Sequence, residues 1–137
     1  MHEIGYKNCR LEIQYINRYL GHAEDEVLYR DSRGHLHMLM HGFYDMFPGG
    51  HGWTTDKTGL TGWEFSSTAA YTMDAYLDGK LTKLGQRERP QVVVKNGSIT
   101  HLFNGAAGPR GYNGGNRFNM VTQICQHGVA VAGVCPT

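Results

Sequence analysis

Two glutamates, Glu24 and Glu88, hold equivalent places in a pattern that occurs twice, at residues 24–42 and 88–105. The alignment also matches Gly42 to Gly105, and its offset is 63 to 64 positions. Carboxyl groups that converge from two copies of a unit can act as general acid and general base. We therefore take Glu24, Glu88 and the adjacent Asp25 as candidate catalytic residues. In the second copy Arg89 replaces Asp25, and its planar guanidinium could hold a carboxylate or a hydroxyl group.

A structural explanation of these carboxylates stays open. Glu24 and Glu88 could instead begin strands and pair with Arg87, Arg89 or backbone amides, which would hold neighbouring strands in register. A buried charge needs such partners whether or not it takes part in catalysis. The repeat by itself therefore does not distinguish the two roles.

The elements that must position these groups are β-hairpins. Each copy holds two β-prone runs separated by a turn signal, Asp31 to Gly34 in the first copy and Lys95 to Gly97 in the second. Outer strands are expected from the alternating segments that follow. The predicted strands cover residues 27–29, 36–40, 52–55 and 63–66 in the first copy, and 92–94, 99–103 and 117–124 in the second.

Repeated units of about 63 residues with alternating apolar residues fit the four-stranded blades of a β-propeller. The fold is thus predicted as all-β and the chain as one propeller-type segment, residues 1–137. It contains a first unit at 20–70, a second at 84–125 and a tail or closing strand at 126–137. Two blades cannot close a ring, because propellers typically need four to eight. Either the chain is part of a longer polypeptide, or several copies complete the ring as a homo-oligomer.

The composition restricts the partners. A net charge of +1 and 18% charged residues give no basic stripe, so nucleic-acid binding is not expected. The sequence has no apolar run of twenty residues, so no membrane span is expected either. No cofactor is expected, and no spacing of cysteines or histidines specifies a metal site.

Several of these segments together resemble the five-bladed β-propellers related to glycoside hydrolase family 43. The resemblance covers about residues 20–125 and is carried by segments 24–37, 49–56, Trp63, 87–91 and 100–105. It implies a protein that handles glycans outside the cell or in the secretory pathway. The Asn96-Gly97-Ser98 sequon at a hairpin turn is compatible with that location.

The resemblance also implies a reaction. Such enzymes hydrolyse a glycosidic bond with inversion, using carboxyl groups on innermost strands about 6.5 to 9.5 Å apart, one of which is kept protonated. Glu24 and Glu88 each begin an innermost strand and are expected near the ring axis. The sequence departs from the family pattern at Glu26, where related chains have the proline that the second copy keeps as Pro90.

A second set of polar residues is predicted to bind substrate. Strand alternation puts His37 and His41 on one face, with Leu39 between them, and Gly49 and Gly50 are expected to form a sharp turn that brings His51 inward. In the aromatic loop, Tyr44 and Asp45 could form a sugar subsite. The complete predicted substrate-binding set is His37, His41, Tyr44, Asp45, His51, Arg89, His101 and Asn104.

Three functions remain open at this stage. The chain could be part of a glycoside hydrolase-like enzyme, a lectin-like oligomer that binds glycans without turnover, or a structural subunit of a larger assembly. The first would need additional repeats upstream, the second symmetric oligomers that bind sugar, and the third no affinity for any glycan.

Overall fold

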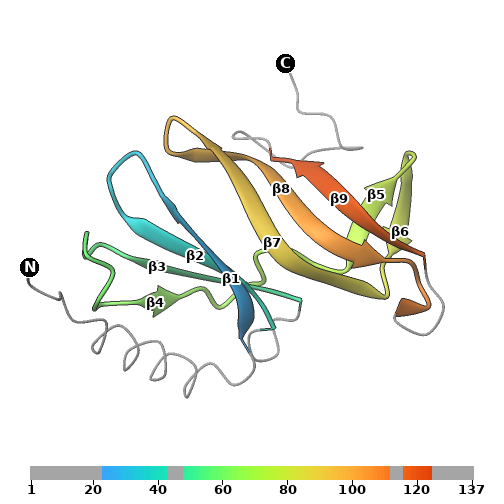
Figure 1. Cartoon of the computed structure of the whole chain (residues 1–137), viewed down its shortest axis with the longest axis horizontal. Coiled ribbons are helices and arrows are strands. Elements are labelled where there is room, and N and C mark those ends of the chain that lie inside the picture. Colours follow the sequence, from blue (N-terminus) through green and yellow to red (C-terminus); the bar gives the residue numbers. More distant parts are fainter. Residues whose placement is uncertain (1–22, 43–47, 112–115, 125–137) are drawn as a thin grey trace, which may run out of the picture.

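The computed structural model describes residues 23–42, 48–111 and 116–124, which form an all-β structure of three antiparallel sheets (Figure 1). The predicted all-β class is confirmed for this part of the chain. The predicted closing strand at 126–137 lies outside the described residues. Within the described ranges, no helix is long and apolar enough to cross a membrane.

The first sheet has the strand order β1-β2-β3-β4. Its strands are β1 (Glu24–Arg30), β2 (Leu36–His41), β3 (Gly49–Thr54) and the short β4 (Glu64–Phe65). The turn between β1 and β2 is held by Asp31, whose Oδ1 accepts hydrogen bonds from the backbone amides of Arg33 and His35. This sheet is the four-stranded unit that the first copy predicts.

The second sheet has the order β7-β8-β9, with strands β7 (Gln86–Lys95), β8 (Ser98–Ala107) and β9 (Arg117–Gln123). The Asn96-Gly97 turn has positive φ at both residues, 52° and 74°, as expected for a two-residue hairpin. Three strands, not four, pair in this sheet among the described residues. A separate hairpin that the sequence reading did not predict, β5 (Asp74–Leu77) and β6 (Lys80–Lys83), turns at Asp78-Gly79.

The two copies of the pattern form the hairpins β1-β2 and β7-β8, and their strand pairing is the same at a constant offset of 64. Glu24 pairs with His41 and Glu88 with Gly105, and Leu28 pairs with Met38 as Val92 does with Leu102. The match of Gly42 to Gly105 in the sequence alignment is therefore wrong by one position. The strand pairing sets the correspondence, and a second irregularity at Val93/Val94 in β7 accommodates the different turn.

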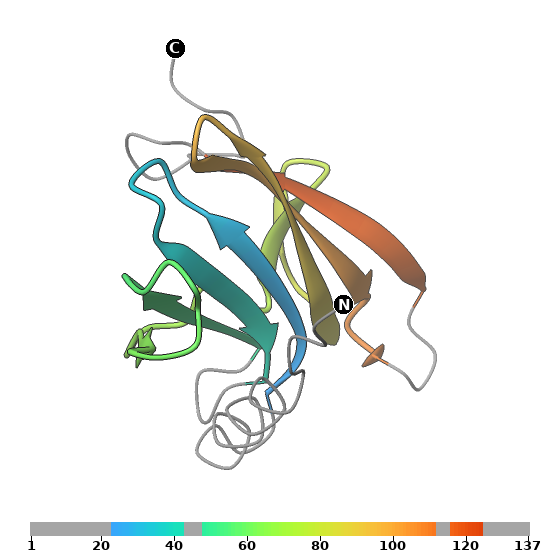
Figure 2. The same cartoon turned by 60° about the vertical axis from the view of Figure 1, so that its left-hand side comes forward.

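The two large sheets lie side by side, and β1 and β7 are neighbours (Figures 1 and 2). The hairpins also meet at their tips, where a Cβ on Gly97 would lie 2.1 Å from the Ser32 amide nitrogen. One core cluster lies between the sheets and contains Leu39, Tyr71 and Leu102. Another packs the β5-β6 hairpin onto the β7-β9 sheet through Ala75, Leu84, Ala106 and Met120.

Each sheet has two faces, which we name by their residues. Because side chains alternate along a strand and paired residues share a face, face A of the first unit carries Val27, Tyr29, His37, Leu39, His41 and His51. Face A of the second unit carries Gln91, Val93, His101, Phe103, Gly105 and Val121. Face B is the opposite side, with Leu28, Met38 and Met40 in the first unit and Val92, Leu102 and Asn104 in the second.

Candidate functional site

Both hairpins contain a β-bulge directly after their first glutamate. Between the pairs Glu24/His41 and Val27/Leu39, two residues of β1 oppose the single residue Met40. The second unit repeats this arrangement, with Arg89 and Pro90 opposite Asn104. A bulge is one of the few places where proline fits inside a sheet, because the extra residue is not paired.

The first residue of each bulge has a left-handed backbone conformation although it is not glycine. The φ angle is 55° at Asp25 and 54° at Arg89. Such a conformation costs about 1–2 kcal/mol for a residue with a Cβ atom. It turns both polar side chains away from the direction that a regular strand would give them, and residues of this kind are concentrated at functional sites.

The two bulges meet at Arg89. Its Nε atom lies 4.0 Å from Asp25 Oδ2, and its Nη2 atom lies 3.9 Å from Glu88 Oε1. The side chain of Glu88 is 11% exposed, against 36% for Asp25 and 72% for Arg89. The structure thus brings together three predicted site residues, with one guanidinium between two carboxylates of different burial.

Glu24 faces a buried histidine across the strand pair. Its Oε1 atom lies 3.1 Å from His41 Nδ1, and its side chain is 66% exposed while that of His41 is 8% exposed. Together with Asp25, these residues place one oxygen or nitrogen ligand atom each within 4.8 Å of one another. Of the described residues, this is the group that could ligate a divalent cation, which the sequence reading did not expect.

Behind Glu88, on face B, Arg87 is buried among neutral partners. Its Nε atom donates to Asn104 Oδ1 at 3.0 Å, Nη1 to the Thr72 carbonyl at 2.9 Å and Nη2 to Thr122 Oγ1 at 3.2 Å. The guanidinium also lies 5.0 Å from the centre of the Tyr71 ring. Burial lowers the pKa of Arg87 and raises that of Tyr71. Arg87 therefore connects the β7-β9 sheet to the segment Tyr71-Thr72, and the hydrogen bonds described for its side chain do not include Glu24 or Glu88.

Asn104 has a structural role beside the site. Its side-chain amide donates to the Glu88 carbonyl at 3.3 Å, directly before the bulge. The side-chain oxygen of Asn104, Oδ1, accepts the hydrogen bond from Arg87, and the residue is 2% exposed. It therefore supports the backbone of Glu88, and its predicted contact with substrate stays a prediction.

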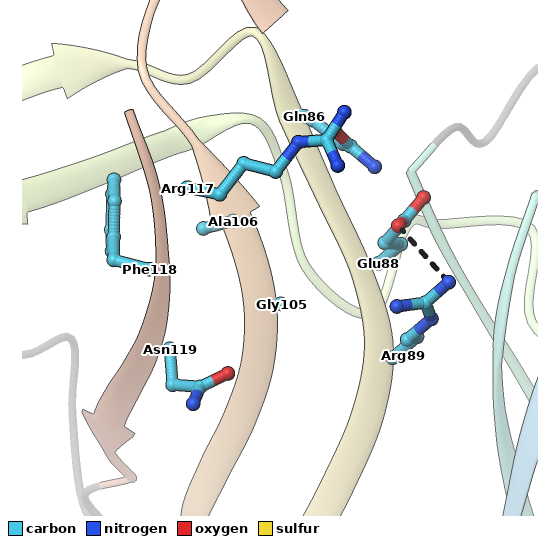
Figure 3. Close-up of a pocket in the computed structure, with 8 residues that line it drawn as sticks. All are labelled: Gln86, Glu88, Arg89, Gly105, Ala106, Arg117, Phe118 and Asn119. Atoms are coloured by element: carbon cyan, nitrogen blue, oxygen red, sulfur yellow. Dashed lines mark ion pairs between the residues drawn. The ribbon is translucent and has the colours of Figure 1, made fainter. Parts of the chain in front are cut away.

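A pocket of about 290 Å³ opens beside Glu88 at this end of the β7-β9 sheet (Figure 3). This volume is close to the lower end of the range of small-molecule sites, about 300–1,000 Å³. The wall combines a carboxylate, two guanidinium groups, two amides and one aromatic ring over a small-residue floor. The lining residues are Gln86, Glu88, Arg89, Gly105, Ala106, Arg117, Phe118 and Asn119.

The histidines predicted to bind substrate fall into separate places. On face A, His37 Nδ1 and His51 Nε2 lie 3.0 Å apart with their ring planes at 3°, the geometry of an edge-to-edge hydrogen bond rather than a stack. The other nitrogen of His37 lies 3.3 Å from Asp31 Oδ2 without good hydrogen-bond geometry, so we treat this contact as electrostatic. His101, the counterpart of His37, contacts Thr100 instead.

Electrostatics along this carboxylate and imidazole line are directional. Burial, and then the charge of His37, lower the pKa of His51 below its ordinary value of 6.5. Desolvation acts to raise the pKa of Asp31, but contacts from Arg33, His35 and His37 hold it well below its ordinary value. Of the two imidazoles, His51 therefore favours the neutral form, and His37 lies between it and the ionised carboxylate of Asp31.

The prediction that Gly49 and Gly50 form a turn is wrong, because both lie in β3. A Cβ on Gly49 would lie 2.4 Å from the Tyr71 ring, so this position needs glycine for close packing. Tyr44 and Asp45 lie outside the described residues. The pocket residues Gln86, Arg117, Phe118 and Asn119 were not predicted as site residues, although the pairing of the third strand with Gly105 would have identified Asn119.

Comparison of the chain with models of known protein families, with curated protein sequences and with solved structures finds no match.

Proposed function

We propose that the chain binds carbohydrate at the end of the sheets where the two bulges meet, and that its two large sheets are neighbouring blades of a β-propeller. The observation that carries this proposal is the pair of equivalent bulges that directs Asp25 and Arg89 toward each other beside Glu88. Bulges re-aim side chains at active and binding sites. The same end of the β7-β9 sheet holds a pocket.

The pocket chemistry suits a sugar. Sugar hydroxyl groups both donate and accept hydrogen bonds, so a wall with acceptors at Glu88 and donors at Arg89, Arg117 and the amide of Asn119 can satisfy them. Phe118 borders the pocket but packs against the core cluster that contains Ala106 and Met120, so the recognition we propose depends on the polar wall. A volume of about 290 Å³ limits the occupant to about one sugar residue of a longer glycan.

Hydrolysis of a glycosidic bond is the second candidate. It is favoured by the different environments of Glu88, which is buried, and Asp25, which is partly exposed, on either side of Arg89. Carboxyl groups in different environments can divide the roles of acid and base. A binding role without turnover, as in a lectin, uses the same residues and is what we propose first.

An extracellular or secretory location is part of this proposal. It is supported by the position of the sequon, because Asn96 is exposed at the tip of the β7-β8 hairpin. Treatment of protein from a eukaryotic secretory host with an N-glycosidase should reduce its mass if Asn96 carries a glycan.

The proposal is tested by a glycan-array scan followed by calorimetric titration with the best glycan. Glu88→Gln keeps the shape of the side chain and removes the charge, and Asn119→Ala removes one amide from the exposed wall. Glu88→Gln should weaken binding by about tenfold or more and Asn119→Ala by about fivefold, since a bond to a charged group is worth about 1.5–3 kcal/mol and a neutral one about 1.

Two matched controls accompany these variants. Glu26→Gln changes an exposed glutamate of β1, and Gln123→Ala shortens an exposed amide on β9 far from the pocket. Both should bind as the unaltered chain does. If no glycan binds, or if Glu88→Gln and Asn119→Ala bind normally, the sugar site is not in this pocket. Release of reducing sugar that is lost in Glu88→Gln would favour the hydrolase.

A further inference from the structure

The structure points to a second interaction surface, on the same face of the β7-β9 sheet as the pocket. The starting observation is the interface inside the chain. Face A of the first unit packs against face B of the second: Leu39, Val27 and Tyr29 contact Leu102 and Val92 in one cluster. Because face A of one unit meets face B of the other, the contact is head-to-tail rather than symmetric.

Face A of the second unit has the same register but is open. By strand pairing its residues are the counterparts of face A of the first unit, 64 positions on in β7 and β8 and 70 positions on in β9. Leu39 is 6% exposed, whereas its counterpart Phe103 is 37% exposed. Val93 and Val121, the counterparts of Tyr29 and His51, are 44% and 53% exposed. These three residues make an apolar patch across all three strands of the sheet.

The edge of face A is covered in the first unit but not in the second. In the first unit the Tyr71 ring lies against Gly49 at the edge of face A. In the second unit the residue at the same level is Asn119, which pairs with Gly105 as Gly49 pairs with His41. Asn119 is exposed and lines the pocket.

Face B of the first unit is partly covered by its own residues, because Met38 and Met40 pack with Trp63 and Phe65. Its residue Leu28 is 57% exposed, whereas the counterpart in the second unit, Val92, belongs to the cluster between the sheets. The chain therefore displays an unmatched face A at one side and an unmatched face B residue at the other. Each has an exposed apolar side chain at a position that is packed in the internal interface.

We propose that face A of the second unit binds face B of the first unit at Leu28 in another copy of this chain, in the same head-to-tail sense as the internal interface. A head-to-tail contact of this kind forms a ring if the rotation closes and a growing filament if it does not. The patch of Val93, Phe103 and Val121 is the centre of the contact on one copy, and Leu28 is on the other.

The test measures the mass of the purified chain by light scattering and sedimentation over a range of concentrations. The unaltered chain is expected to associate. Phe103→Lys charges face A and Leu28→Lys charges face B, and each should raise the dissociation constant by about tenfold or more, since a buried unpaired charge is unfavourable. Leu81→Lys, at a 63% exposed position on β6, is the matched control and should leave association unchanged.

Mixing the variants identifies the geometry. Phe103→Lys retains an intact face B and Leu28→Lys an intact face A, so an equimolar mixture should form one-to-one dimers, although each variant alone is monomeric. Circular dichroism verifies that all chains are folded. A folded, unaltered chain that stays monomeric would overturn the proposal, as would normal association of either variant or a mixture that fails to dimerise. None of these changes is in the pocket, so glycan binding by the folded monomeric variants can be measured apart from association.

Discussion

The equivalent bulges allow a sharp prediction about backbone strain. Asp25 and Arg89 hold φ near 55° in both units, where a residue with a Cβ atom is disfavoured by about 1–2 kcal/mol and glycine is not. Glycine in turn lowers stability by about 0.4–1 kcal/mol relative to alanine, because it gives the unfolded chain more conformational entropy. The balance is that Asp25→Gly and Arg89→Gly should each be more stable than the matching alanine variant, by about 1 kcal/mol.

Comparing glycine with alanine removes the side-chain contribution, since both variants lose the contacts of Arg89 with Asp25 and Glu88. Those contacts are long and partly exposed, at 4.0 and 3.9 Å, so they contribute only about 0–1 kcal/mol. The assay is urea unfolding followed by circular dichroism, with the midpoint and slope fitted for each variant.

Glu26 supplies the control, because it is exposed and adjacent but has no positive φ. There alanine should be more stable than glycine by about 0.5–1 kcal/mol, the opposite sign. The reasoning would be refuted if alanine were more stable at Asp25 and Arg89 as well. A difference in sign between the two bulges would show that only one unit holds the strained conformation.

Four further predictions follow from the described contacts. Asn104→Met gives the second unit the residue of the first and should lower the free energy of unfolding by about 3 kcal/mol, because Arg87 Nε and the Glu88 carbonyl lose the Asn104 side chain as a partner. Denaturant unfolding measures this change, and an unchanged free energy of unfolding would contradict the assigned bonds. Gly49→Ala should lower the free energy of unfolding by about 1–3 kcal/mol, because the added Cβ would meet the Tyr71 ring. Gly105→Ala should lower it less, because a Cβ there would lie 3.8 Å from the Glu88 carbonyl oxygen, and equal effects would count against close packing at Gly49. Hydrogen bonds from Thr58, together with weaker ones from Thr61, lower the pKa of Asp56 to about 2, so the contribution of Asp56 to stability is complete above about pH 4 and is lost as the pH falls toward 2. Asp56→Asn should flatten that part of the curve of stability against pH, and an unchanged curve would refute the prediction. Because the pKa of His51 is lowered in the folded chain, His51 binds a proton at a higher pH in the unfolded chain, and stability should decline as the pH falls below 6.5. His51→Phe should reduce that decline, and an identical pH profile would show that His51 does not cause it.

The hairpins could be predicted from the sequence because their signals are local. The Val92 to Val94 run and the Asn96-Gly97 turn specify β7-β8 without information from the rest of the chain. The β5-β6 hairpin carried a similar signal at Asp78-Gly79, a turn dipeptide with positive φ at both residues. It was missed because its strands are only four residues long.

The bulges could not be predicted in the same way. A left-handed residue is usually signalled by glycine, but here aspartate and arginine hold that conformation. The one available signal was Pro90, which a regular central strand does not accommodate. The alignment error at Gly42 has a related cause, since glycine was matched to glycine while the strand pairing places Gly105 opposite Glu88.

The two units have similar backbones but differ in what supports them, and this difference favours the second unit as the place of the proposed binding site. At the position opposite the bulge the first unit has Met40, which is fully buried, and the second has Asn104. The amide bonds the Glu88 backbone and Arg87 together, so this carboxylate rests on a connected polar network. Glu24 is largely exposed and contacts His41 alone among the bonds described for its side chain. A preorganised, buried carboxylate beside a pocket is the better group for recognising a ligand, because less order has to be gained on binding.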